Sequence, residues 1–157
     1  MQKKKEEGEL MKLALASDHG GFALKEALKA HLTTKGYEVV DLGTDSTESV
    51  DYPLFGEACG RAVAEGKAER GIVCCGTGIG ISIAANKVPG IRCAVVTNAF
   101  MAEMCRKHND ANIIALGGRI LPEEEAIRLT DIWLENEFEG GRHQRRVDLL
   151  NSMGTGK

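Results

Sequence analysis

Residues 70–87 read RGIVCCGTGIGISIAANK, and this segment gives the clearest indication of the chain's organisation. It starts with a short apolar run at 70–76, passes through a loop with glycine at every second position, and ends in the helix-like segment 81–87. A short, nearly continuous apolar run is typical of a strand buried on both faces of a sheet. We therefore predict a strand, a tight glycine loop and a helix, in that order.

The same alternation of strand and helix extends along the chain in both directions. Strands are predicted over 12–18, 38–43, 70–76, 91–96 and 112–118, and helices over 22–36, 54–66, 81–87, 99–109 and 122–137. The last of these helices has Pro122 at its start and three glutamates directly after it, which suits the positive end of a helix dipole. Strands that alternate with helices predict an α/β fold, a doubly wound sheet of five parallel strands with helices on both faces.

The length of 157 residues fits one domain, which we expect over residues 11–154. Two glycines at 140–141 separate the last predicted helix from a basic, helical tail. Residues 1–10 are expected to be a charged flexible extension, and they lack the apolar run of a signal peptide. The sequence also has no apolar stretch of the roughly 20 residues needed to cross a bilayer.

Charge and cysteine content narrow the class of protein. A net charge of -3 gives no general attraction to nucleic acid, so neither nucleic acid nor a membrane is an expected partner. The five cysteines are an odd number without the spacing of a disulfide framework, and neighbouring Cys74 and Cys75 would pair only with strain. We therefore expect a cytoplasmic protein.

Distinctive residues follow the predicted strands, where open α/β sheets bind their ligands. They are Asp18 and His19 after the first strand, Asp51, Tyr52 and Pro53 in the loop after the second, Cys75–Gly80 after the third, and Gly117, Gly118 and Arg119 after the fifth. Because the carboxyl ends of parallel strands share one edge of the sheet, these residues form one candidate site.

The glycine loop after Cys75 has two readings. Its backbone N–H groups, at the start of a helix, suit a phosphate or an oxyanion, but a plain tight turn fits equally well. The loop lacks the Lys-Ser or Lys-Thr of a Walker loop, and its spacing departs from the dinucleotide fingerprint.

Neighbouring strand residues point to opposite faces, so only one of Cys74 and Cys75 can face the crevice at the carboxyl end of the sheet. We expect that one to be Cys75, with a pKa lowered by the helix start, and the other cysteines to be packing residues.

Histidines and arginines supply the remaining candidates. His31 lies within the first helix pattern and is expected to pack, whereas His19 and His108 stand beside polar neighbours at helix boundaries. A zinc site from Cys75, His19 and His108 is conceivable, although no paired ligand spacing is present. Arg142 and Arg146, four residues apart, would share one helix face and either clamp a phosphate or form a solvated basic surface.

Six segments in one order resemble a known family. They are SDHGG (17–21), DYP (51–53), CGTGIGISIAANK (75–87), GIRCA (90–94), RKHNDANI (106–113) and EGGRHQRRV (139–147). Together they resemble the B-type ribose 5-phosphate isomerases and their lactose-pathway relatives over about residues 11–150. The resemblance implies a Rossmann-like domain that uses neither metal nor cofactor, and a homodimer or homotetramer whose active site is shared between subunits.

The resemblance also implies a role for each candidate residue. Cys75 would be the base that removes the proton next to the carbonyl, Thr77 would assist proton transfer, and His108 would open the furanose ring. The glycine loop would stabilise the enediolate oxygen, since removing this proton is feasible only if the resulting charge is stabilised. The residues implied to bind substrate are Asp18, His19, Tyr52, Gly76, Gly78, Ile79, Gly80, Asn109, Arg119, Arg142 and Arg146. One branch of the family uses a loop glutamate as base, and Ile81 stands at that position here.

The leading interpretation is therefore an aldose–ketose isomerase that interconverts ribose 5-phosphate and ribulose 5-phosphate through an enediolate. A six-carbon substrate, such as allose or galactose 6-phosphate, is the first alternative, because it shares the reacting carbons. A nucleotide-binding or redox-sensing module that uses Cys74 and Cys75 as a switch is a more distant alternative.

Overall fold

One parallel sheet forms the centre of the molecule in the computed structural model, which describes residues 10–154. The strands are β1 (Lys12–Ser17), β2 (Glu38–Asp41), β3 (Arg70–Cys75), β4 (Cys93–Val95) and β5 (Ile113–Gly117). They lie in the order β2-β1-β3-β5-β4, and every neighbouring pair is parallel. The prediction of a five-stranded parallel sheet is confirmed. Apart from Leu10, the predicted extension over residues 1–10 lies outside the described residues.

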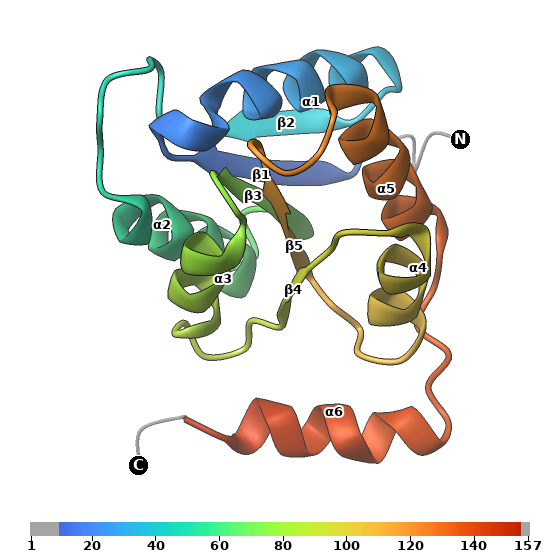
Figure 1. The fold of residues 1–157 in the computed structure, drawn as a ribbon. Helices are drawn as coiled ribbons and strands as arrows, with labels where there is room; N and C mark the ends of the chain where they lie inside the picture. Colours follow the sequence, from blue (N-terminus) through green and yellow to red (C-terminus); the bar gives the residue numbers. More distant parts are fainter. Residues whose placement is uncertain (1–9, 155–157) are drawn as a thin grey trace.

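Helices cover both faces of this sheet (Figure 1). The helices are α1 (Phe22–Thr34), α2 (Tyr52–Ala64), α3 (Ile79–Asn86), α4 (Ala99–Lys107), α5 (Glu123–Glu135) and α6 (Arg142–Ser152), with a short 3-10 turn η2 (His19–Gly21) before α1. Helices α1, α4 and α5 lie on one face and α2 and α3 on the other, whereas α6 lies outside both layers. Among the described helices, none combines the length and apolar composition that a bilayer crossing requires.

The strands bury alternate side chains in two separate cores. Leu13 and Leu15 of β1 face the layer of α1, α4 and α5, while Ala14 and Ala16 face α2 and α3. In β3, Cys74 belongs to the first core and Cys75 to the second. This is the alternation expected of a strand, and it places the two neighbouring thiols on opposite faces of the sheet.

Most predicted boundaries differ from the structure by one or two residues, and two of these differences have a local cause. Tyr52 is the first residue of α2 rather than part of a loop, because Pro53 occupies the first turn, where its missing N–H costs nothing. Strand β4 is three residues long instead of the predicted six. β4 lies at the edge of the sheet. Directly before it, the backbone N–H of Arg92 donates to the side-chain Oδ1 of Asn112 at 2.8 Å instead of to a backbone carbonyl of β5.

Glycines bring the loops at the carboxyl ends of β1 and β3 close together. A Cβ at Gly21 would lie 2.4 Å from the carbonyl carbon and oxygen of Cys74, so only glycine permits this contact. Gly78 precedes α3 with a φ of 84°, a conformation that favours glycine. The turn η2 therefore packs directly against the end of β3, next to Cys75.

Candidate active site

The carboxyl edge of the sheet gathers most of the predicted site residues. Ser17 of β1 pairs with Cys74 of β3, and Cys75 pairs with Gly117 of β5, so the three strands end level with one another. The predicted residues that the structure brings to this edge are Asp18, His19, Tyr52, Cys75, Gly76, Thr77, Gly78, Ile79, Gly80 and Arg119. They come from four separate segments of the chain, which follow β1, begin α2, join β3 to α3 and follow β5.

Cys75 is the last residue of β3, and its side chain meets the start of the glycine loop. The N–H of Gly78 donates a hydrogen bond to its Sγ at 3.2 Å, which fixes the sulfur beneath the loop. The residue is 5% exposed. The next amide, that of Ile79, donates to the Oγ1 of Thr77 at 3.1 Å. The thiol of Cys75, the hydroxyl of Thr77 and the amides of Gly78 and Ile79 therefore lie within the five residues 75–79.

The other four cysteines lie in different surroundings. Cys59, Cys74 and Cys105 are buried and Cys93 is half-buried, and all five cysteines are unpaired. Desolvation raises the pKa of the Cys59 thiol to about 12 and that of Cys105 to about 11, and it also raises the pKa values of Cys74 and Cys93. These four thiols stay protonated near neutral pH, which makes them poor bases and agrees with the packing role expected for them.

Asp18 and His19 are held by backbone contacts that determine what each can offer a ligand. The Oδ1 of Asp18 accepts the N–H of Gly21 at 3.1 Å, which leaves its other oxygen to bind a hydroxyl. The Nδ1 of His19 lies 3.2 Å from the backbone N–H of Val50 and accepts its hydrogen bond. A neutral imidazole that accepts at Nδ1 carries its proton at Nε2. His19 can therefore donate a hydrogen bond to an anion.

Arg119 and Tyr52 border the same edge. Cβ atoms built at Gly20 and Gly76 would lie 3.3 Å and 3.0 Å from the guanidinium of Arg119, so this group lies across both glycines. The backbone N–H of Arg119 also donates to the carbonyl of Gly76 at 2.9 Å. A Cβ at Gly80 would meet the ring of Tyr52 at 2.7 Å, and this ring is 41% exposed. A cation and a phenol thus flank the glycine loop.

The remaining predicted residues form a second cluster. His108 caps the carboxyl end of α4, Asn109 follows it, and Arg142 and Arg146 lie exposed on the first two turns of α6. The imidazole of His108 stacks on that of His143, with ring centroids 4.1 Å apart and an angle of 14° between the planes. The Oε1 of Glu139 lies 3.9 Å from the Nε2 of His108 and 3.8 Å from the Nε2 of His143.

The two clusters lie at opposite edges of the sheet within one chain. Cys75 is level with Gly117 at the carboxyl end of β5, whereas His108 precedes Ile113 at the amino end of the same strand. The four steps from Ile113 to Gly117 span about 13 Å at roughly 3.3 Å per residue. The fold of one chain therefore does not bring the two clusters together. If the active site is shared between subunits, as the resemblance implies, each cluster is one half-site.

A group of possible metal ligands lies in the second cluster. Within residues 10–154, the group of donors close enough to share an ion is His108, Glu139 and His143. Their nearly parallel rings direct their nitrogen lone pairs side by side, so a shared ion would require one ring to rotate. The set Cys75, His19 and His108 is divided between the two edges of the sheet and does not form a zinc site within one chain.

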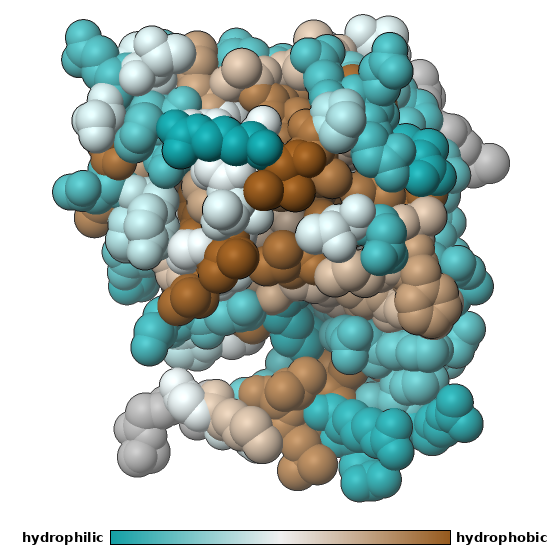
Figure 2. Space-filling view, in the orientation of Figure 1, coloured by the Kyte–Doolittle hydropathy of each residue, from teal (hydrophilic) through white to brown (hydrophobic). Residues whose placement is uncertain are grey.

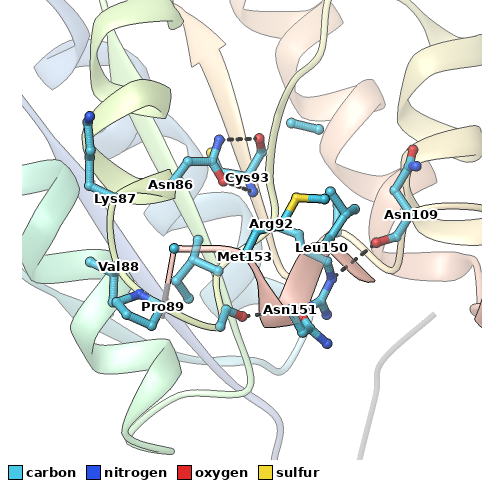
Figure 3. A pocket seen from close by; sticks show the side chains of 15 residues that line it. Asn86, Lys87, Val88, Pro89, Arg92, Cys93, Asn109, Leu150, Asn151 and Met153 are labelled. Carbon is cyan, nitrogen blue, oxygen red and sulfur yellow. Dashed lines mark hydrogen bonds between the residues drawn. The ribbon is translucent and has the colours of Figure 1, made fainter. Parts of the chain in front are cut away.

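A cavity of about 610 Å³ lies away from Cys75, between the end of α6 and the segment that joins α3 to β4 (Figure 3). On one side, Asn86 makes two hydrogen bonds with the backbone of Cys93. On the other side, Arg92 donates to the Oδ1 of Asn151 at 2.7 Å and to the carbonyl of Asn109 at 3.1 Å. Figure 2 shows this hollow between α6 and the rest of the molecule, with apolar side chains of α6 exposed near it.

Comparison with known proteins identifies the family. The model of the Ribose/Galactose Isomerase family matches residues 13–150. The chain is 46% identical to "Ribose-5-phosphate isomerase B" of Escherichia coli over 144 residues, which are 92% of this chain and 97% of that protein. The chain belongs to the ribose/galactose isomerase family.

Solved structures of this isomerase family agree with the fold. Ribose-5-phosphate isomerase B of Clostridium thermocellum has a TM-score of 0.90 at 56% identity, covering 90% of this chain and 96% of its own. The enzyme from Mycoplasma genitalium, solved with bound ribulose-5-phosphate, has a TM-score of 0.89 at 38% identity, covering 94% of this chain and 98% of its own. The family predicted from the six sequence segments is confirmed.

Two features of this isomerase-family chain bear on its chemistry. Ile81, which the sequence resemblance placed at the position of the loop glutamate of one family branch, is fully buried among α2, α3 and the sheet, and its apolar side chain cannot act as a base. Glu139 and His143 were not among the predicted site residues. Both lie in the segment EGGRHQRRV, and that segment was the only sequence signal for them.

Proposed function

We propose that this chain interconverts ribose 5-phosphate and ribulose 5-phosphate through an enediolate, with its own side chains and backbone as the only catalysts. It belongs to an isomerase family, and relatives that align over nearly their whole length are named ribose-5-phosphate isomerase B. The observation that carries the proposal is the thiol of Cys75, held by the Gly78 amide at the mouth of a glycine loop.

Cys75 is the base in this proposal. A carbon acid next to a carbonyl loses its proton only if the charge that forms on the oxygen is stabilised at the same time. The amides of Gly78 and Ile79 already donate to Cys75 and Thr77. Stabilisation of the enediolate oxygen therefore falls to other amides of the loop, those of Gly76 and Gly80, which lie beside the helix start.

Thr77 passes the proton between the two sugar oxygens. Its Oγ1 accepts the N–H of Ile79, which leaves the hydroxyl proton free to point toward a ligand. The side chain is exposed at the mouth of the loop, two residues from the proposed base. This arrangement suits a group that donates to one oxygen of the enediolate while Cys75 returns its proton to carbon.

The sugar and its phosphate extend from the loop toward η2. Asp18 offers one carboxylate oxygen to the sugar hydroxyls, and Tyr52 closes the side of the pocket at Gly80. His19 donates from Nε2 and Arg119 supplies a fixed positive charge, so both suit the phosphate. These four residues belong to the same half-site as Cys75.

A second copy of the chain completes each site. His108, Asn109, Arg142 and Arg146 form the other half-site, and the length of β5 separates His108 from Cys75 of its own chain. At the end of α6, Leu149, Leu150 and the following Met153 are 51%, 47% and 66% exposed, an apolar surface that a second copy would cover. We infer a homodimer with two shared sites, in which His108 opens the furanose ring and the two arginines bind the phosphate.

A reducing cytoplasm remains the expected compartment. All five cysteines are unpaired in the structure, including the adjacent Cys74 and Cys75. Opposite orientation of these two thiols, together with full burial of Cys74, also argues against the redox-switch alternative.

Turnover of the purified protein tests the proposal. Ribose 5-phosphate is supplied and ketose formation is followed, with allose 6-phosphate and galactose 6-phosphate in parallel. The expected result is the highest kcat/KM on the five-carbon substrate. Ketose formation from neither class would refute the isomerase, and a higher kcat/KM on a six-carbon phosphate would refute the substrate assignment.

A further inference from the structure

We propose that His143 is a positioning residue for His108, whose imidazole it holds by face-to-face stacking in the plane required for opening the sugar ring. The inference rests on the ring-opening role proposed above for His108. The proposed function gives His143 no role of its own. His143 is buried, whereas Arg142 and Arg146, the residues of α6 proposed to bind phosphate, are exposed.

The stack joins two elements that otherwise lie apart. His108 directly follows α4 and His143 lies in the first turn of α6, yet their ring centroids are 4.1 Å apart and their planes differ by 14°. His143 and Val147 are the buried side chains of α6. Since this helix lies outside both helical layers, the imidazole is one of the few groups that fix its start against the body of the protein.

The two rings have different access to solvent. The side chain of His143 is 10% exposed, whereas that of His108 is 37% exposed. The outer ring, His108, is therefore the one that a substrate can reach, and the inner ring supports it from behind. Burial suits a residue that positions its neighbour, and exposure suits a residue that transfers a proton to or from the substrate.

Ring stacking is the direct contact between His108 and His143, because the carboxylate of Glu139 does not hydrogen-bond to either ring. Glu139, in the loop before α6, lies 3.8–3.9 Å from the Nε2 atoms of both rings, beyond hydrogen-bond length. Its backbone N–H donates to the carbonyl of Lys107 at 3.0 Å, which places this carboxylate beside His108. Arg142 and Arg146 face His143 from α6 itself.

Desolvation, followed by the charge of His108 and that of Arg142, lowers the pKa of His143. A neutral His143 can stack against His108 whether His108 is protonated or neutral. Consequently, His108 can gain and lose a proton without its support moving away.

Ring opening depends on the orientation of the proton-transfer group. The furanose opens when a proton leaves the anomeric hydroxyl and another reaches the ring oxygen O4, and both transfers need a nitrogen within hydrogen-bond reach. A displacement of about 1 Å in such a group costs up to roughly 100-fold in rate. Loss of one supporting face should cost less, and we expect about a tenfold loss.

The experiment compares ribose 5-phosphate with its 4-deoxy analogue in the full-length protein. The analogue lacks O4 and carries its phosphate on O5, so it cannot form a furanose ring and needs no ring opening. His143→Ala should lower kcat/KM about tenfold on ribose 5-phosphate and less than about twofold on the analogue. His143→Phe keeps a flat ring and should recover at least about a third of the wild-type value on ribose 5-phosphate.

Two further variants separate the possible failures. Gln144→Ala, on the exposed face of the same turn, should leave kcat/KM unchanged on both substrates. His108→Asn should show the same selectivity as His143→Ala with a larger loss, and an equal loss on both substrates would refute its ring-opening role. If His108→Asn is selective but His143→Ala affects both substrates equally, or neither, the positioning role is wrong. Failure of His143→Phe to recover activity would likewise overturn it.

Discussion

Mixing two inactive variants tests whether each active site is built from two chains. Cys75→Ala removes the proposed base from one half-site, and His108→Asn removes the ring-opening group from the other. The two residues lie at opposite ends of strands that pair within one sheet. In a shared site, Cys75 of one copy works with His108 of its partner.

The expected recovery follows from counting sites. When the two variants exchange subunits freely at equal concentration, about half of the dimers contain one copy of each. Such a heterodimer has one site with both defects and one site with neither. The mixture should therefore reach about 25% of the wild-type rate, although each variant alone is nearly inactive.

The assay measures ketose formation after the two variants are mixed and incubated long enough to exchange subunits. Wild-type protein that has been through the same incubation provides the reference, and a mixture of two independently purified Cys75→Ala samples provides the blank. A site contained within one chain leaves no intact site in any heterodimer. Activity that stays at the level of the separate variants, with subunit exchange verified by native mass spectrometry, would refute the shared site.

Three other predictions concern stability and metal dependence. Gly21→Ala should lower the free energy of unfolding by about 1–3 kcal/mol in urea titrations, because its Cβ would lie 2.4 Å from the backbone of Cys74; an unchanged midpoint would contradict this packing. Burial raises the pKa of Cys59 from 9.0 to about 12, so the folded state retains a proton that the unfolded state loses, and stability should fall as pH rises from 9 toward 12. The slope should be shallower in Cys59→Ala by up to about 1.4 kcal/mol per pH unit, and equal slopes would contradict the buried thiol. Dialysis against EDTA should leave kcat unchanged, whereas a loss that zinc reverses would contradict catalysis by side chains alone.

The fold could be predicted from the sequence because its signals are local. Buried runs such as residues 70–75 mark strands of a parallel sheet, and the helices between them carry apolar residues at helical spacing. The predicted start of α2 was wrong because Pro53 was assigned to the preceding loop, although proline is also favoured in the first turn of a helix. The short β4 depends on a side-chain contact from Asn112, which no local pattern records.

The candidate site was predictable in part for the same reason. Residues that follow strands, such as Asp18 and Cys75, gather at one edge in every parallel sheet, so their proximity follows from the order of elements. The stack of His143 on His108 depends on how α6 meets the end of α4, which is a tertiary contact without sequence periodicity. The separation of the two half-sites likewise required the register of β3 and β5.

Hydrogen exchange at the reacting carbon tests the role of Cys75 most directly. Ribose 5-phosphate is incubated in D2O with wild-type, Cys75→Ala or Cys93→Ala protein, and proton NMR follows the loss of the signal from the hydrogen on C2. We expect an exchange rate at least about 100-fold lower for Cys75→Ala, with Cys93→Ala close to wild type. Exchange by Cys75→Ala within a few-fold of the wild-type rate would contradict it.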